Sequence, residues 1–482
     1  MLNTVLPTPK SVHAEEEWIS FAPCLSFDPC FEKQAMALRT AVKKLFGVEL
    51  SEGEGGFYLV SDAAQPQDSY RIETSCDGMV LAAGESHGMA FALATALQCA
   101  HFEKGKFCSL VFCMEDQPDK EYRCLMVDLA RAWHPLRTLL SYVDVCFFLK
   151  VKYLHLHFID MERYTLPSRA FPNIGGGKEQ YTEEELARLN EYALQRGVIL
   201  VPEFEAPGHA ASLTRTYPEV FANRIPDGKD GRVETEVGVL SSDSVVCPGR
   251  KECMDGICIL LKEICDLFPN SPYIHIGGDE AAYPAWDHCT DCVAYMKEHG
   301  ISDAHELYSE FVGRVAQFVL DQGRTPIVWE GFPEKGVHYI PKQTVVVAWE
   351  SLYMLADELL RHGFKIINGS WKPLYIVDNP ALRWGPREIM AWDVYQWQNW
   401  WEKSAAYLNP VRVSPCDDVL GAQISSWGCT YEQDIARVVE HLCALTERTW
   451  NVRRLQDDES FGRRMRATCA AVFDLIAEND RL

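Results

Sequence analysis

Short apolar runs alternate with longer amphipathic stretches along most of the chain after residue 123. The stretches have the apolar spacing of helices, as at 182–196, 302–322 and 430–448. A short apolar run alone does not separate a strand from a buried helix, but eight alternations of this kind are what a (β/α)8 TIM barrel requires. We therefore expect such a barrel over residues 119–455. The eight runs lie at 124–130, 152–159, 198–205, 272–278, 325–330, 344–350, 364–369 and 421–427.

The first 118 residues follow a different pattern. Helical spacing at 33–45 and again from 88 to 102 flanks three runs with strand character, at 57–60, 70–74 and 78–84. The polar, Pro-bearing segment EDQPDKEYR then separates this part from the first barrel run. We expect a small α+β domain over 1–118 before the barrel, and a helical extension over 456–482 after it.

Composition narrows the class of protein without changing this fold prediction. The chain has 482 residues, 47% hydrophobic and 24% charged, and no stretch approaches the roughly 20 continuous apolar residues of a membrane span. A net charge of -23 argues against nucleic acid or an anionic membrane as a partner. The first twenty residues do not resemble a secretory signal, so we expect a cytoplasmic protein whose 18 cysteines are free thiols. We expect a monomer or a homodimer.

Acidic and aromatic residues follow the predicted strands, where a TIM barrel builds its active site. Four tryptophans converging with carboxylates favour a sugar pocket over a core, because sugar C–H faces pack on aromatic rings while hydroxyls bond to carboxylates. The residues after the strand runs are Asp160, Glu203, Glu205, His209, Asp279, Glu280, Trp329, Glu330, Trp349, Glu350, Trp371, Tyr375 and Trp427.

The run HIGGDEAAYPAW at 275–286 follows the fourth predicted strand. Gly277 and Gly278 remove side chains where a ligand must approach the backbone, and two acids follow at once. Neighbouring charges and burial can separate the pKa values of such a pair, so Asp279 and Glu280 can divide acid and base roles. Both side chains reach one ligand only if the backbone turns at this point, because consecutive strand residues point to opposite sides.

Ordered motifs throughout the chain resemble those of glycoside hydrolase family 20, the β-N-acetylhexosaminidases. Residues 275–280 resemble the family's His-x-Gly-Gly-Asp-Glu motif, and the N-terminal unit resembles the small domain before its barrel. The other similar segments are YRCLMVDLARAW (122–133), LHLHFID (154–160), VPEFEAPGHA (201–210) and ALTERTW (444–450).

The resemblance implies an exo-acting, retaining enzyme that releases terminal GlcNAc or GalNAc from an oligosaccharide or glycoconjugate. In this mechanism the acetamido oxygen of the substrate attacks the anomeric carbon and forms an oxazolinium intermediate. Glu280 then serves as acid and base, Asp279 orients the acetamido N–H, and Tyr375 bonds to the acetamido oxygen. The resemblance also implies substrate-binding roles, for Arg123, Asp160, His209, Trp329, Trp349, Trp371 and Trp427.

Four positions depart from the family pattern. Cys429 stands where the family has an acid that contacts the far sugar hydroxyls, so that contact is either missing or supplied by another residue, with Glu350 and Glu432 as candidates. The others are Glu205 in place of Asp, Lys152 in place of Asn, and Asp378 one residue later than the family spacing. These departures leave the choice between gluco and galacto substrates open.

Two other functions stay open beside the glycosidase. His155, His157, His209, His275 and Asp279 contain the residue types of a metal-dependent hydrolase on the same barrel. A sugar-binding protein without activity is the other alternative. We expect no cofactor and no catalytic metal, although His288, Cys289 and Cys292 could hold a small metal site, with Cys253 and Cys258 only loosely spaced as a second half-site.

Overall fold

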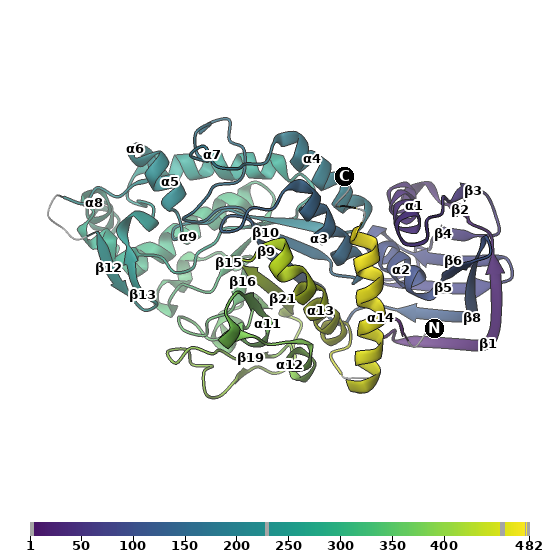
Figure 1. Cartoon of the computed structure of the whole chain (residues 1–482). Coiled ribbons are helices and arrows are strands. Elements are labelled where there is room, and N and C mark those ends of the chain that lie inside the picture. Colours follow the sequence, from purple (N-terminus) through teal and green to yellow (C-terminus); the bar gives the residue numbers. More distant parts are fainter. Residues whose placement is uncertain (1–3, 227–230, 454–457, 478, 480–482) are drawn as a thin grey trace.

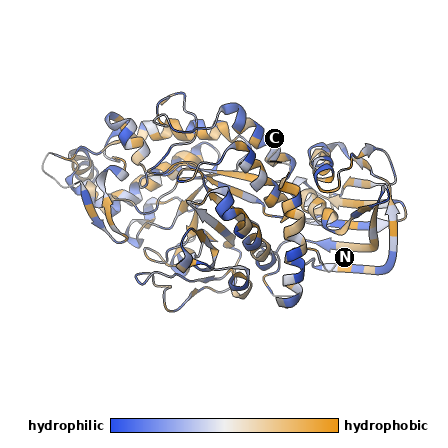
Figure 2. Ribbon diagram, in the orientation of Figure 1, coloured by the Kyte–Doolittle hydropathy of each residue, from blue (hydrophilic) through white to orange (hydrophobic). Residues whose placement is uncertain are grey.

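A computed structural model describes residues 4–226, 231–453, 458–477 and 479 of the chain. It has two parts, a sheet-and-helix domain at the N-terminus and a larger barrel (Figure 1). Hydrophobic residues gather in the strands and on the helix α2 between the two parts, whereas loops are largely hydrophilic (Figure 2).

The N-terminal domain is one mixed sheet packed against two helices. Its strands run in the order β1-β8-β5-β6-β4-β2-β3, with β7 paired to β8. The helix α2 is almost wholly buried because it lies between the sheet and the barrel helix α3 (Leu136–Phe148). The elements are β1 (Ser11–Phe21), β2 (Cys24–Phe27), α1 (Glu32–Phe46), β3 (Ser51–Glu52), β4 (Phe57–Ser61), β5 (Tyr70–Ser75), β6 (Gly78–Ala83), α2 (Ser86–Cys99), β7 (His101–Glu103) and β8 (Lys106–Asp116).

Eight parallel strands form the barrel, as the alternating pattern predicts. The order β17-β16-β15-β14-β11-β10-β9-β21 is closed by pairing between β17 and β21. Their side chains are buried on both faces, which explains the continuous apolar runs. The strands are β9 (Tyr122–Asp128), β10 (Tyr153–His157), β11 (Ile199–Glu203), β14 (Tyr273–His275), β15 (Thr325–Trp329), β16 (Val345–Ala348), β17 (Lys365–Asn368) and β21 (Val419–Trp427).

Helices surround the barrel and connect successive strands. A capping box of Thr182 and Glu185 begins α4, and left-handed Gly300 ends α8. The long helices include α4 (Glu183–Gln195), α7 (Lys251–Leu267), α8 (Thr290–His299), α9 (Ala304–Asp321) and α13 (Tyr431–Trp450). The last described helix, α14 (Asp458–Ala477), packs on α1, α3 and α13 and so touches both parts (Figure 1).

Additional elements follow the carboxyl ends of the barrel strands. The segment after β11 contains α5 (Ala211–Thr216), α6 (Pro218–Phe221), β12 (Arg232–Thr235) and β13 (Gly238–Ser241), and the 3-10 helix η4 (Tyr283–His288) follows β14. After β17 the chain forms α11 (Trp371–Leu374) and β18 (Tyr375–Val377), which pairs in parallel with β21 outside the closed ring. Four shorter elements lie between β16 and β21, namely α10 (Ala356–Arg361) before β17, and α12 (Pro386–Ala391), β19 (Gln396–Trp397) and β20 (Val411–Arg412) after β18. Of these elements, α11 and β18 contribute residues to the lining of a pocket at this end of the barrel.

Candidate active site

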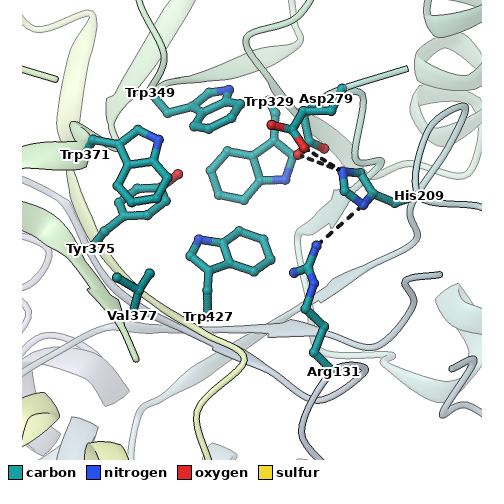
Figure 3. A pocket seen from close by; sticks show the side chains of 10 residues that line it. Arg131, His209, Asp279, Trp329, Trp349, Trp371, Tyr375, Val377 and Trp427 are labelled. Carbon is teal, nitrogen blue, oxygen red and sulfur yellow. Dashed lines mark hydrogen bonds and ion pairs between the residues drawn. The ribbon is translucent and has the colours of Figure 1, made fainter. Parts of the chain in front are cut away.

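The carboxyl ends of the barrel strands enclose a pocket of about 190 Å³. It is a single concave chamber walled largely by aromatic rings, with charged groups on one side (Figure 3). The carboxyl ends of seven barrel strands, or the segments that follow them, and the added strand β18 supply the lining, which places the site where TIM barrels build theirs. The lining residues are Arg131, His209, Asp279, Glu280, Trp329, Trp349, Trp371, Tyr375, Val377 and Trp427.

The four tryptophans predicted to form a sugar pocket do converge. The Trp371 ring stacks on Tyr375 with centroids 4.1 Å apart, and Trp329 lies 5.9 Å from Trp427. The Trp349 ring is nearly parallel to Tyr375 at 6.3 Å. Three rings are fixed by their indole N–H groups, which donate to Glu203, to the Glu330 carbonyl and to Glu350. The walls are therefore rigid apolar faces suited to a sugar ring.

The loop 277–280 carries both acids into the pocket. Its backbone turns sharply, with positive φ at Gly277 (69°), Gly278 (104°) and Glu280 (43°). The two glycines serve protein neighbours instead of a ligand, because an added Cβ would lie 2.1 Å from Glu205 Oε1 and 2.6 Å from Val328 Cγ2. The left-handed Glu280 is a strained conformation of the kind found at functional sites.

A histidine links the two acids to a buried aspartate. His209 Nε2 lies 3.3 Å from Glu280 Oε2 and 3.7 Å from Asp279 Oδ2, while its Nδ1 lies 3.1 Å from Asp160 Oδ1. Arg131 completes this cluster with an ion pair of 2.6 Å to Asp160, and its guanidinium lies 5.0 Å from the centre of the Trp427 ring. Figure 3 shows its contact with His209. Through these contacts Asp160 holds His209, and His209 in turn orients the Glu280 side chain toward the pocket.

These surroundings separate the pKa values of the two acids. Burial, with the nearby charge of Glu280, raises the pKa of Asp279 to about 6. Burial also disfavours ionised Glu280, but the imidazole of His209 and the charge of Arg131 outweigh it and lower its pKa. Burial alone would lower the pKa of His209, yet Asp160 and both acids raise it well above its usual value. Below about pH 6 the pair therefore holds its proton on Asp279, facing an ionised Glu280.

Glu205 supports the loop from below. Its Oε1 accepts a hydrogen bond of 3.1 Å from the Gly278 N–H, and burial beside Asp279 raises its pKa well above the usual range. Glutamate in place of the family's aspartate thus contacts the loop backbone.

Three histidines surround Glu203 beneath the pocket. His155 Nε2 and His275 Nδ1 each lie 3.0 Å from its carboxylate, and His157 bonds to it as well. All four side chains are buried, and none lines the pocket. Of the residues that suggested a metal-dependent hydrolase, only His209 and Asp279 reach the pocket. The geometry therefore favours a hydrogen-bonded floor over a catalytic metal centre.

Polar atoms in the pocket wall lack hydrogen-bond partners among the residues that the structure describes. They are the Tyr375 hydroxyl, Asp279 Oδ1, the Trp427 indole N–H and His209 Nε2, all buried. Since buried polar groups are normally paired, these atoms mark where a ligand would bond. The donor hydroxyl of Tyr375 and the acceptor of Asp279 suit a group that both accepts and donates, as an amide does.

The structure places Arg123 away from the pocket, although a substrate-binding role was expected for it. Arg123 lies at the amino end of β9, the opposite end from the pocket, with its guanidinium wholly buried. It donates to the carbonyls of Lys150 (2.9 Å) and Lys120 (2.6 Å) and lies over the Phe91 ring of α2. Arg131, eight residues later in the same similar segment, occupies the pocket instead. Counting along the strand would have found it, because only the carboxyl end of β9 faces the site.

Two other predicted sugar contacts lie just behind the lining. Asp160 is fully buried under Arg131 and His209, so it positions these side chains and does not line the pocket. Glu350 bonds to Trp371 Nε1 at 3.2 Å and to Asn399, and burial near Glu330 raises its pKa to about 8. Val377 lines the pocket without a sequence signal, because β18 was not expected.

The departure at Cys429 leaves no acid in its place. The Cys429 thiol contacts the Trp427 carbonyl at 3.4 Å and the Arg437 guanidinium at 3.5 Å, and it does not line the pocket. Neither Glu432, exposed on α13, nor Glu350 lines it either. Arg131 is the guanidinium donor available to sugar hydroxyls among the lining residues.

Known proteins resemble this chain over nearly all of its length. Residues 121–453 match the family model described as glycosyl hydrolase family 20, catalytic domain. A beta-hexosaminidase of Akkermansia muciniphila is 28% identical over 92% of this chain and 91% of its own. A beta-hexosaminidase subunit beta of Entamoeba histolytica is 26% identical over 82% of this chain and 70% of its own.

Solved structures share the fold. An exo beta-N-acetylglucosaminidase of Vibrio harveyi superposes with a TM-score of 0.82 at 21% identity, covering 99% of this chain and 78% of that one. A beta-N-acetylhexosaminidase of Bacteroides fragilis superposes with a TM-score of 0.76 at 22% identity, over 95% of this chain and 93% of that one. Separately, no helix in the described ranges combines the length and apolar character needed to cross a membrane.

Proposed function

Because the chain belongs to glycosyl hydrolase family 20 and is thereby a glycoside hydrolase, we propose that it is an exo-acting, retaining β-N-acetylhexosaminidase. It releases terminal β-linked GlcNAc or GalNAc from the non-reducing end of an oligosaccharide or glycoconjugate. The observation that carries this proposal is that one aromatic pocket contains both an acceptor, Asp279 Oδ1, and a donor, the Tyr375 hydroxyl. Both atoms are buried and have no hydrogen-bond partner among the described residues.

The acetamido group of the substrate satisfies both atoms. Its N–H donates to Asp279, and its carbonyl oxygen accepts from the Tyr375 hydroxyl, while the rings of Trp329 and Trp349 enclose its methyl group. These contacts hold the carbonyl oxygen against the anomeric carbon, which makes it the nucleophile of a substrate-assisted reaction. A neutral sugar without this group leaves both atoms unpaired, at a cost in transition-state binding.

Proton transfer is the task of Glu280. The acetamido oxygen attacks the anomeric carbon, the glycosidic bond breaks, and Glu280 gives its proton to the leaving oxygen. Asp279 balances the positive charge of the oxazolinium that results. Glu280, now ionised, takes a proton from water as that water attacks the anomeric carbon, which reopens the ring and retains the β configuration.

The substrate also places the proton of the carboxyl pair. An amide N–H can only donate, so its approach favours ionised Asp279, and the proton that Asp279 holds in the empty pocket then belongs on Glu280. His209 and Asp160 hold Glu280 in place during both steps.

A panel of p-nitrophenyl glycosides tests the proposal. We expect hydrolysis of β-GlcNAc or β-GalNAc substrates and none of β-glucose, which lacks the acetamido group. Purified Glu280→Gln is expected to lose nearly all turnover of the preferred substrate, and Asp279→Asn to lose less but still orders of magnitude. Glu432→Gln, which removes an exposed acid on α13, serves as the matched control. Wild-type rates in Glu280→Gln, or binding of GlcNAc without hydrolysis by the wild type, would overturn the assignment.

A further inference from the structure

Three cysteines from two separate loops meet beside the catalytic strand ends. Cys247 lies before α7, whereas Cys289 and Cys292 lie at the start of α8, and all three are buried. The Cys247 sulfur lies 3.5 Å from Cys289 Sγ and 3.5 Å from Cys292 Sγ. The three ligand atoms fall within 4.8 Å of one another. They form what we call the thiol cluster.

The spacing of the thiol cluster fits a shared metal ion better than a disulfide. A disulfide brings two sulfurs to about 2.05 Å. Four ligands around zinc at about 2.3 Å place neighbouring sulfurs about 3.8 Å apart in a tetrahedron. Cys247 Sγ is near this second spacing from both other sulfurs, and Cys289 and Cys292 Sγ lie within 4.8 Å of each other, which a disulfide between two of them would not produce.

A candidate for the fourth ligand, the side-chain oxygen of Asn223, lies beside the thiol cluster. Asn223 Oδ1 lies 3.8 Å from Cys292 Sγ. Its amide nitrogen donates to the Val245 carbonyl at 2.8 Å and to Ser242, which fixes the side chain with its oxygen toward the cluster. An amide oxygen about 2.1 Å from zinc would lie close to this distance from a bound sulfur.

The backbone around Cys289 suits a negatively charged sulfur. The Arg224 N–H donates to Cys289 Sγ at 3.3 Å, and Cys289 and Cys292 lie at the N-terminus of α8, whose dipole stabilises a negative charge.

The backbone is shaped for this contact. A Cβ on Gly249 would lie 2.6 Å from the Asp291 carbonyl and 2.6 Å from Cys292 Cα, so only glycine lets the segment after Cys247 reach α8. Trp286 of η4 donates to the Val246 carbonyl at 2.9 Å in the same place. Two loops are thus held together at close range around the sulfurs.

We propose that Cys247, Cys289 and Cys292, with Asn223 Oδ1, bind one structural zinc ion. The ion ties the loop after β11, which carries His209, to the segment after β14, which carries Asp279 and Glu280. The ion stabilises the positions of these two segments and takes no part in the reaction. This proposal does not depend on the glycosidase assignment, because the cluster lies outside the pocket lining.

The metal content of the purified full-length chain tests the site. We expect about one equivalent of zinc per chain by plasma mass spectrometry, and a fall below about a tenth of that in Cys247→Ser, Cys289→Ser and Cys292→Ser. Cys253→Ser is the matched control, since Cys253 is equally buried on α7 but is not a proposed ligand. Asn223→Leu is expected to weaken binding, and Asn223→Asp to retain it.

Measurements on the unchanged protein keep the test independent of variant folding. Zinc removal with a chelator should lower the melting temperature, and zinc but not magnesium should restore it. Cobalt in place of zinc should give the absorption of a tetrahedral thiolate site. Inactive Glu280→Gln should carry the same zinc, which separates this outcome from failure of the proposed activity. Protein free of zinc, loss of zinc in Cys253→Ser as well, or a mass two hydrogens lighter from a disulfide would overturn the proposal.

Discussion

Asp279 and Glu280 are neighbours in sequence with different surroundings. The Asp279 side chain is 12% exposed and unpartnered at Oδ1, whereas Glu280 is 35% exposed and faces the imidazole of His209. At Asp279, burial and the charge of Glu280 outweigh the charge of His209 and raise the pKa, whereas at Glu280 His209 and Arg131 outweigh burial and lower it. One proton is shared by the pair, and its macroscopic pKa belongs to both residues.

The pH dependence of kcat/KM follows from this shared proton. A raised pKa means that the proton is held below about pH 6 and lost as the pH rises through that value. Because Glu280 needs the proton for its acid step, kcat/KM should fall about tenfold per pH unit above this point. A pH profile with p-nitrophenyl substrate measures it.

Asp279→Asn provides the control for this profile. Without the charge of Asp279, Glu280 keeps only the influence of His209 and Arg131, so the alkaline limb should move to lower pH. A limb that stays in place would assign the titration to another group.

Arg131 and Arg123 are expected to have opposite phenotypes. Arg131→Met removes the charged donor of the pocket, and losing a charged hydrogen bond should lower kcat/KM about 10- to 150-fold. Arg123→Met leaves the buried carbonyls of Lys120 and Lys150 unpaired and should lower the free energy of unfolding by about 1–3 kcal/mol with kcat/KM unchanged. Kinetics and urea unfolding of both variants distinguish the roles. If Arg123→Met lost activity but kept its stability, Arg123 would have the substrate-binding role after all.

At the scale of elements, the site is built by the segments that extend from the strand ends. The strand β14 is only three residues long, and the loop 277–280 leaves it with left-handed residues that aim both acids inward. The added strand β18 pairs with β21 and places Tyr375 against the tryptophans. Rigid elements thus fix both ends of the acetamido contact proposed here.

Gly277→Ala should abolish activity through the position of this loop. Its Cβ would overlap the Glu205 carboxylate at 2.1 Å, so the loop must move. Gly323→Ala is matched in backbone, with φ of 72° against 69°, but has no atom within 4 Å. Gly323→Ala should lower the free energy of unfolding by only about 1–2 kcal/mol, the cost of a Cβ on a left-handed backbone. Comparing kcat and melting temperature separates the two effects, and equal activity losses would contradict the steric explanation.

At the scale of the molecule, the N-terminal domain closes the amino end of the barrel. Lys152, at the start of β10, forms a buried ion pair of 2.7 Å with Asp68 in the loop before β5. Lys150 likewise approaches Asp116 and the Tyr70 hydroxyl of the sheet. The departure at Lys152 therefore concerns the junction of the domains, far from the sugar.

Lys152→Met should destabilise the protein without changing catalysis. It leaves the Asp68 carboxylate buried and unpaired, at a cost of about 3–5 kcal/mol in the free energy of unfolding. Adding Asp68→Asn, which tolerates the left-handed backbone there, should recover part of that loss. Urea unfolding of both variants checks this. A double variant no more stable than the single one would argue against the ion pair.

Periodicity and motif order in the sequence determined the barrel, its eight strands and the acids and tryptophans of the site. They could do so because burial on both faces of a strand leaves a local apolar run, and because the residues after each run share one end of the barrel. The edge strand β1 escaped notice, since its exposed acidic residues hide the apolar pattern. Free thiols were expected, and all 18 cysteines are unpaired in the structure.

Only the tertiary structure decided which similar residues face the ligand. Arg131, and not Arg123, lies in the pocket, and Asp160 lies behind His209. Cys247 contacts Cys289, which is 42 residues later in the sequence. The tertiary structure also raised the pKa of Asp279 and lowered that of Glu280. Sequence pattern is local, whereas the direction of a side chain, its burial and its charged neighbours depend on segments that meet when the barrel closes.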